Sequence, residues 1–314
     1  MKPLKLGIFA SSYIAPVVVV EEEGIVARGV FGGGYDSAVL NVIDYITIAT
    51  TGNATDFGDL TVARAYPAAC SSTTRGVFAG GYVSANSNVM DYITIATVGN
   101  ATDFGDLTQG ARARNGCSST TRGVFAGGYD VDNYSTVMEY ITIATTGNAT
   151  SFGTLTVGRD FMGALSSTTR GVFAGGYTTG SAYGNTIDYI TIATVGNATD
   201  FGDLTVARRT VACSSTTRGV FGGFMGDGVG SLTIDYITIA TVGNAISFGD
   251  LTVARNYLGA CSSTIRGVFG GGAGPSNVMD YITIATTGNA TDFGDLTVAR
   301  YTLAALSNAH GGLG

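Results

Sequence analysis

Tryptophan is absent from this chain of 314 residues, histidine occurs once, and lysine occurs twice, at Lys2 and Lys5. The single histidine, His310, stands in a glycine-rich tail that we expect to be exposed to solvent, which argues against a Ser-His-Asp triad. Copper chemistry needs several imidazole ligands and is excluded for the same reason. Phosphate backbones are bound by groups of Lys and Arg, so without a basic cluster nucleic acid is not an expected partner.

Charged residues are also scarce, at 12% of the chain, which is about half of the usual share of roughly 25%. The net charge is −7, and 45% of the residues are hydrophobic. We therefore expect an ample apolar core under a surface built largely from Thr, Ser, Asn and Gly. No transmembrane span is expected. Residues 6–20 are apolar and follow two lysines, which suggests a signal peptide, but Pro16 interrupts the run and no clean small-residue cleavage site follows. We interpret residues 1–27 as an ordered N-terminal arm, in which Val17–Val20 could add an edge strand or dock on a partner.

The few cysteines all occupy one position of a repeat, where two other copies carry leucine. A position that accepts either residue is a packing position, so we expect small buried hydrophobic side chains there. Equivalent positions of different repeats lie too far apart for disulfides, and no CxxC pair suggests zinc. No metal or other cofactor is expected. The packing position of the repeat is occupied by Cys70, Cys117, Cys213, Cys261, Leu165 and Leu306.

A repeat runs through almost the whole chain. The string Arg-Gly-Val-Phe starts at Arg28, Arg75, Arg122, Arg170, Arg218 and Arg266, which gives spacings of 47, 47, 48, 48 and 48 residues. A period in the forties with almost no helical periodicity indicates stacked supersecondary units of β type. One unit divides into four strands, at residues 68–72, 75–81, 89–96 and 102–107, with a turn at Gly99-Asn100. Six such units predict an all-β fold, a six-bladed β-propeller of four-stranded antiparallel blades.

The repeat resembles the kelch motif. In the second unit the matching residues are Gly80-Gly81, Asp91-Tyr92 and Phe104, and the arginine before the next blade matches Arg64 or Arg300 elsewhere. The resemblance covers about residues 28 to 308. It departs from the motif where phenylalanine replaces the usual tryptophan, and in the fifth unit at Gly222-Gly223-Phe224-Met225. It implies a kelch-like propeller, a fold that serves many functions. The near-identical units also look like repeat proteins of marine bacteriophages.

The ring is expected to close through the C-terminus. Glu21-Glu22-Glu23 stands where the first unit should have its small-residue strand, and three carboxylates cannot line a crowded axis. A spare strand of small residues follows the sixth unit at about 303–307. We predict that it inserts into the first blade and removes the exposed sheet edges. The domain organisation is then an arm at 1–27, a propeller at 28–308 and a tail at 309–314.

Six acidic residues recur at one position of the third strand: Asp44, Asp91, Glu139, Asp188, Asp235 and Asp280. A glycosidase needs two carboxylates in different environments, so we interpret these equivalent acids as partners of nearby arginines such as Arg64, or of backbone donors. A carboxylate-dependent glycoside hydrolase stays as a remote alternative. The repeated Asn-Ala-Thr strings match a glycosylation sequon, but we interpret them as hairpin turns.

Binding is the remaining class of function. Two sets of variable loops share one face of such a propeller, and tyrosine, asparagine and arginine on a rigid scaffold are typical of binding surfaces. The candidate ligand-binding residues are Tyr66, Arg114, Asn133, Tyr134, Tyr183, Arg209, Tyr257 and Tyr301.

We therefore expect a non-enzymatic structural or binding protein of a virion, a phage fibre, tail or head-decoration propeller that contacts a host-surface glycan or protein. Its other partners would be virion proteins, reached through the N-terminal arm, and a homo-oligomer is open. The alternative is a purely architectural assembly subunit with no ligand. The expected location is the phage particle, or otherwise the cell surface or the extracellular space.

Overall fold

The structure of the protein is a computed structural model that describes residues 26–131, 133–180, 182–223 and 230–313. The proposed N-terminal arm, including Val17–Val20, lies almost wholly outside these residues, as do Phe224 and Met225 of the irregular fifth unit. Within the described residues the secondary structure is strand and turn, without a helix. The expectation of an all-β chain is therefore confirmed for this part.

Six sheets have four antiparallel strands each. Sheet 1 comprises β27 (Ala304–Ser307), β1 (Arg28–Gly32), β2 (Val42–Thr47) and β3 (Thr55–Asp59), and sheet 2 comprises β4 (Ala68–Ser71), β5 (Arg75–Ala79), β6 (Val89–Thr94) and β7 (Thr102–Asp106). Sheet 3 comprises β8 (Asn115–Ser118), β9 (Arg122–Ala126), β10 (Val137–Thr142) and β11 (Thr150–Thr154), and sheet 4 comprises β13 (Gly163–Ser166), β14 (Arg170–Ala174), β17 (Thr186–Thr191) and β18 (Thr199–Asp203). Sheet 5 comprises β19 (Val211–Ser214), β20 (Arg218–Gly222), β21 (Ser231–Thr238) and β22 (Ile246–Arg255), and sheet 6 comprises β23 (Gly259–Ser262), β24 (Arg266–Gly270), β25 (Val278–Thr283) and β26 (Thr291–Asp295).

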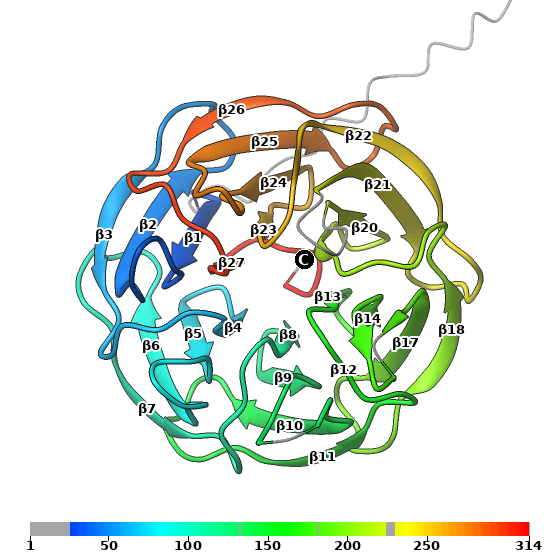
Figure 1. The fold of residues 1–314 in the computed structure, drawn as a ribbon, viewed down its shortest axis with the longest axis horizontal. Coiled ribbons are helices and arrows are strands. Elements are labelled where there is room, and N and C mark those ends of the chain that lie inside the picture. Colours follow the sequence, from blue (N-terminus) through cyan, green and yellow to red (C-terminus); the bar gives the residue numbers. More distant parts are fainter. Residues whose placement is uncertain (1–25, 132, 181, 224–229, 314) are drawn as a thin grey trace, which may run out of the picture.

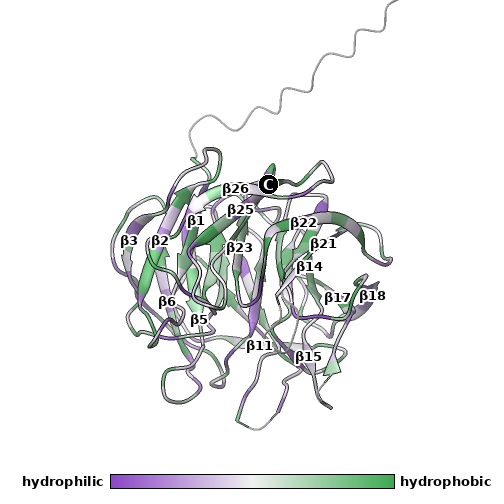
Figure 2. Cartoon of the chain, turned by 45° about the horizontal axis from the view of Figure 1, so that its top comes forward, coloured by the Kyte–Doolittle hydropathy of each residue, from purple (hydrophilic) through white to green (hydrophobic). Residues whose placement is uncertain are grey.

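The sheets lie around a common centre, each with its first-listed strand innermost (Figure 1). A seventh, three-stranded sheet was not predicted. It is formed by the short strands β12 (Arg159–Asp160), β15 (Tyr177–Thr178) and β16 (Ala182–Tyr183), which belong to the loops before and within sheet 4. The strands carry both apolar and polar segments (Figure 2).

The C-terminal strand joins the first sheet. β27 pairs with β1 in antiparallel register, with Gly29 opposite Ser307 and Gly32 opposite Ala304, which confirms the predicted pairing. The innermost strands are also joined to one another, because one serine in each donates its Oγ hydrogen to the carbonyl of the serine in the preceding sheet. The six bonds, of 2.5 to 3.0 Å, form a closed circle of Ser71, Ser118, Ser166, Ser214, Ser262 and Ser307. We call this circle the serine ring.

Neighbouring sheets meet through residues of matched size. The cysteines are free and buried, and burial raises the pKa of the Cys213 thiol to about 12. A Cβ atom added to Gly29 would come within 2.6 Å of the Cys261 sulfur. The glycine of Arg-Gly-Val-Phe thus makes room for the cysteine or leucine of the sheet before it, which confirms the packing role. The fourth-strand phenylalanines are buried in the same layers: Phe57, Phe104, Phe152, Phe201, Phe248 and Phe293.

Each of the six recurring acids forms a buried ion pair with an arginine that follows the preceding sheet. Asp91 and Arg64 approach to 2.6 Å, and both side chains are fully buried. The prediction of local arginine partners is therefore confirmed. The other pairs are Arg114–Glu139, Arg159–Asp188, Arg208–Asp235, Arg255–Asp280 and Arg300–Asp44. Buried charges are tolerated only when paired and hydrogen-bonded, so the ion pairs account for the burial of these carboxylates.

The expectation that His310 is exposed to solvent is wrong. Its Nε2 atom lies 3.3 Å from the Ser118 hydroxyl, its Nδ1 accepts the Gly312 amide hydrogen at 3.1 Å, and burial lowers its pKa to about 4. Gly311 donates its amide hydrogen to the Ser214 carbonyl. The C-terminal residues thus turn inward across the inner strands, because glycines at 311 and 312 leave space for close contact with carbonyls of the serine ring.

Candidate functional site

Two kinds of loop come together at one end of the sheets. Ala65, in the connection from sheet 1 to sheet 2, pairs with Tyr82 in the loop between β5 and β6. Arg112 pairs with Tyr129 and Tyr301 with Tyr35 in the same way. The variable loops and the connections between sheets therefore form one surface, as expected.

This surface carries ten partly exposed aromatic rings, and we call it the tyrosine face: Tyr35, Tyr66, Tyr82, Tyr129, Tyr134, Phe161, Tyr177, Tyr183, Tyr257 and Tyr301. Nine of the chain's 16 tyrosines are thus gathered at one end of the molecule. Six others follow the recurring acids, one per sheet, and an arginine stacks on each at 4.3 to 4.5 Å. The repeat accounts for those six but not for the tyrosine face.

The rings of the tyrosine face form two contact series. In the first, Tyr66 contacts Phe161, and Phe161 contacts Tyr257, at centroid distances of 5.4 and 5.2 Å, mostly edge to face. In the second, Tyr134 contacts Tyr129 and Tyr177 at 5.2 and 5.6 Å. Such pairs contribute about 0.5–1.5 kcal/mol each beyond their buried area. The surface is therefore a preformed aromatic platform rather than a set of independent side chains.

Arg209 joins the two series. Its guanidinium lies 4.6 Å from the Phe161 ring centre and 4.7 Å from that of Tyr177, and it donates a hydrogen bond of 3.2 Å to the Tyr257 hydroxyl. Arg112 lies in the same manner between Tyr82 and Tyr129, at 5.1 and 4.9 Å. Both arginines thus present cation–π contacts within the face.

Asp160 is the buried acid of this region. It lies on β12 beside Tyr177 of β15, and its Oδ1 atom is 3.7 Å from Arg209, beyond hydrogen-bond distance. Among the described residues that oxygen has no hydrogen-bond partner. Burial raises the pKa of Asp160 to about 7, against the opposing charges of Arg209 and Arg112. The three-stranded sheet therefore holds a carboxyl group that changes charge near neutral pH.

A ring of backbone surrounds the axis at this end. Two residues after each connecting arginine position stand Tyr66, Ala113, Phe161, Thr210, Tyr257 and Thr302, which we call the collar. Five of them, all except Thr210, have φ between 48° and 58°, a conformation that is costly for residues other than glycine. Hydrogen bonds between successive collar positions hold it: the Tyr66 amide donates to Thr302, Ala113 to Tyr66 and Phe161 to Ala113, at 2.8 to 3.1 Å.

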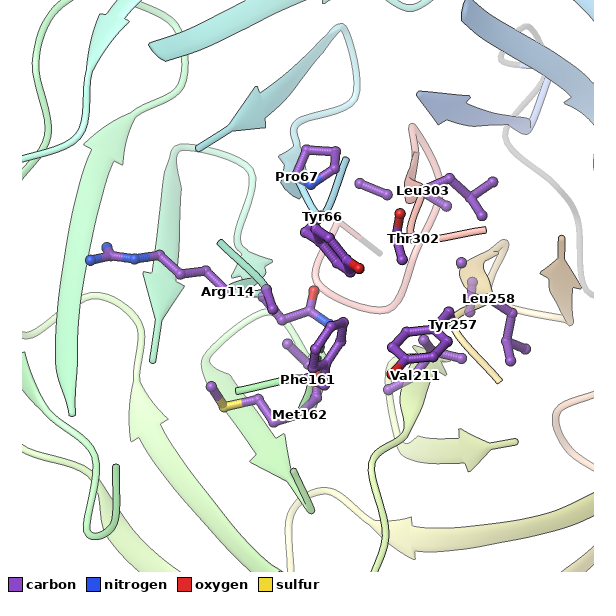
Figure 3. A pocket seen from close by; sticks show the side chains of 18 of the residues that line it. Tyr66, Pro67, Arg114, Phe161, Met162, Val211, Tyr257, Leu258, Thr302 and Leu303 are labelled. Atoms are coloured by element: carbon purple, nitrogen blue, oxygen red, sulfur yellow. Dashed lines mark hydrogen bonds between the residues drawn. The ribbon is translucent and has the colours of Figure 1, made fainter. Parts of the chain in front are cut away.

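A cavity of about 80 Å³ lies under the collar (Figure 3), and we call it the axial pocket. Tyr66, Phe161 and Tyr257 surround its mouth, and small residues of the inner strands form its floor. These are Gly116, Ala164, Ala212, Ala260 and Ala305. Below that floor the serine ring and His310 line the other end of the axis. The axial pocket therefore lies between the tyrosine face and the serine ring.

Most of the candidate residues are brought together. Tyr66, Tyr134, Tyr183, Tyr257 and Tyr301 all lie on the tyrosine face, and Arg209 lies among them. Asn133 is exposed at a loop tip, where its backbone N–H donates to the Asp130 carboxylate.

The guanidinium of Arg114 does not lie on this surface. Its side chain is 1% exposed and pairs with Glu139, because Ala111 stands where the other connections have their buried arginine. Arg112, not selected from the sequence, takes the surface position. Asp160 and Phe161 were also not selected. The signal that finds them is their place directly after the buried Arg159, where each connection enters the collar.

Comparison with known proteins adds no assignment to this geometry. A scan against models of protein families found no match, and a search of curated proteins found no relative. The resemblance to kelch repeats and to phage repeat proteins therefore stays a prediction.

Neither a metal site nor a membrane-spanning helix is found among the described residues. In that part of the chain, no group of three His, Cys, Asp or Glu side chains lies close enough together to hold a metal ion. No helix there has the length and apolar character that a membrane span requires.

Proposed function

We propose that the protein is a six-bladed β-propeller, closed by β27, whose tyrosine face binds glycans of a host surface. Six four-stranded sheets around one centre (Figure 1), the β27–β1 pairing and the circle of serine hydrogen bonds support the architecture. The three-stranded sheet is then formed by the loops beside blade four and is not a seventh blade. A closed ring leaves no free inner edge, so the loops stand on a rigid base.

The gathering of ten aromatic rings and two arginines on one end of this scaffold carries the proposal. Aromatic rings offer large contact area at low entropic cost, and a tyrosine adds a hydroxyl that forms hydrogen bonds. Sugar rings have apolar faces rimmed by hydroxyl groups, which matches a surface of stacked rings with interspersed arginine, aspartate and asparagine. Catalysis is not proposed, because each recurring carboxylate is committed to a buried arginine.

The proposed setting is a virion, in which the propeller is part of a fibre, a tail or a head decoration. The resemblance to phage repeat proteins favours it, and residues 1–27 would anchor the propeller to other virion proteins. The architectural alternative, a subunit with no ligand, predicts that the tyrosine face makes no difference to binding. A host protein as the ligand is a further outcome of the same test.

The test is binding of labelled protein to host cells and to an array of defined glycans. The test variant carries Tyr134→Ala, Tyr183→Ala and Tyr257→Ala. The control variant carries Val98→Ala, Val195→Ala and Val242→Ala, three substitutions of exposed residues on turns at the other end of the sheets. We expect the first variant to lose at least 90% of the binding and the second to keep it. Equal binding by both variants, or no binding to any cell or glycan, would overturn the proposal.

A further inference from the structure

The six collar positions are not occupied alike. Around the axis, aromatic and small residues alternate: Tyr66, Ala113, Phe161, Thr210, Tyr257 and Thr302. Six large rings do not fit around one narrow axis, whereas three fit when a small residue separates each from the next. The result is a three-sided aromatic mouth over the axial pocket, built from units whose strands are otherwise nearly identical.

The volume of the axial pocket limits the size of the ligand that can enter it. Its volume of about 80 Å³ corresponds to roughly five to eight water-sized probes, which is room for one sugar ring or less and not for a chain of sugars. The serine ring and the C-terminal residues cross the axis below the floor. A ligand therefore enters with one end and leaves by the same side.

The polarity of the axial pocket points to an uncharged guest. Arg114 lines it through its stem, while its guanidinium points away (Figure 3) and is paired with Glu139. The Thr302 hydroxyl is buried without a hydrogen-bond partner in the described structure. Once a change of its χ1 rotamer turns it toward the cavity that Thr302 lines, it offers both a donor and an acceptor to a guest. An uncompensated buried hydroxyl costs about 1–3 kcal/mol, which a ligand hydroxyl would recover.

The surroundings of the mouth disfavour a cation, although a three-sided aromatic cage is a known arrangement for ammonium groups. The guanidinium of Arg209 already lies on the Phe161 ring at 4.6 Å and bonds to the Tyr257 hydroxyl. A second positive charge placed between these rings would be repelled at close range. Hydroxyl groups and an apolar sugar face meet no such opposition.

We propose that the axial pocket binds the terminal, uncharged sugar of a glycan end-on, one per chain, while the rest of the glycan lies on the tyrosine face. The inference rests on the proposed function and adds to it the position, the stoichiometry and the class of the terminal residue. Tyr66, Phe161 and Tyr257 would hold the faces and edges of that sugar, and Thr302 would bond to one of its hydroxyls.

The experiment uses an array on which each neutral oligosaccharide is printed both uncapped and capped with sialic acid, followed by calorimetry with the neutral oligosaccharide that binds best. Ala260→Leu fills the floor of the axial pocket without altering the tyrosine face. Its matched control is Ala96→Leu, the same change at an exposed position on the turn after β6, at the other end of the sheets. Thr302→Val removes one hydroxyl and conserves shape. Melting temperatures of all variants show whether each is folded.

We expect one site per chain, at least tenfold weaker binding of the capped glycans, and at least a tenfold loss with Ala260→Leu. We expect a five- to tenfold loss with Thr302→Val and less than a twofold change with Ala96→Leu. If Ala260→Leu does not fold, Thr302→Val decides alone. Glycan binding that survives both pocket variants, or equal binding of capped glycans, overturns this inference and leaves the proposed function standing. No binding to any glycan overturns both.

Discussion

The guanidinium of Arg300 lies 2.7 Å from the carboxylate of Asp44, although 256 residues separate them in the chain. Both side chains are fully buried, and the Thr297 hydroxyl also bonds to Asp44. The pair joins sheet 6 to sheet 1, as Arg64 and Asp91 join sheet 1 to sheet 2. The two ends of the repeat are therefore connected by the same contact that connects neighbours.

Asp44→Ala is expected to lower the free energy of unfolding by about 3–5 kcal/mol, because it leaves a buried guanidinium without a counter-charge. Asp36→Ala, which removes an exposed carboxylate near the same sheet, is expected to change it by less than about 0.5 kcal/mol. Urea unfolding followed by circular dichroism measures both. Equal stability of the two variants would mean that the sheet 6 to sheet 1 contact does not hold the fold together.

Glu139 and Arg114 depart from the other pairs together. Glu139 is a longer acid than the aspartate that stands at this position in the other sheets. Its partner, Arg114, lies three residues after Ala111, which occupies the position where the other connections have their buried arginine. Glu139→Asp makes this position like the others, yet we expect it to destabilise the protein by about 2 kcal/mol, since the shorter side chain leaves a buried guanidinium incompletely paired. Thermal unfolding measures this loss.

A second variant decides whether the pairing itself is responsible. Glu139→Asp combined with Ala111→Arg and Arg114→Ala rebuilds the arrangement of Arg64 and Asp91, and we expect it to recover most of the lost stability. If the stability changes of the separate substitutions simply add up to that of the combined variant, the two side chains are not coupled.

The repeat made much of this architecture predictable. Strands β4 to β7 begin within a residue of the predicted positions, because glycine, the Gly-Asn turn and the alternating Tyr and Ile residues mark each boundary in every copy. The pairing of β27 with β1 followed from one spare strand and one missing strand. The pairing of acids with arginines followed from their equivalence across six units.

Features that occur only once in the chain could not be predicted from the repeat. Arg112 and Arg114 are two residues apart, and only the position of Ala111 decides which one is buried. The tail around His310 has no pattern, since its contacts depend on the geometry of six inner strands and not on neighbours in the chain. The strands β12, β15 and β16 are two residues each, too short to leave a periodic signal.

Asp160 is expected to make stability fall as pH rises. Its pKa is raised to about 7 in the folded state, above the ordinary value of about 3.9, so unfolding releases a proton between these values. The penalty is absent below about pH 4 and complete above about pH 7, with an upper limit of about 4 kcal/mol. Asp160→Asn should therefore be more stable than the wild type at pH 8 and equal to it at pH 4. Urea unfolding across this range measures the difference, and parallel curves for the two proteins would be the contrary result.

His310 is expected to act in the opposite sense. Burial lowers its pKa to about 4 from an ordinary value of about 6.5, so the folded state excludes a proton that the unfolded chain binds. The stability that depends on neutral His310 is fully present above about pH 6.5 and is lost as pH falls toward 4, by about 3 kcal/mol. The glutamine of His310→Gln does not bind this proton. We therefore expect the free energy of unfolding of the variant to rise relative to that of the wild type only as the pH falls from about 6.5 toward 4. Nuclear magnetic resonance titration of the single imidazole measures the same pKa directly. A value near 6.5 would show that the C-terminal residues leave the inner strands in solution.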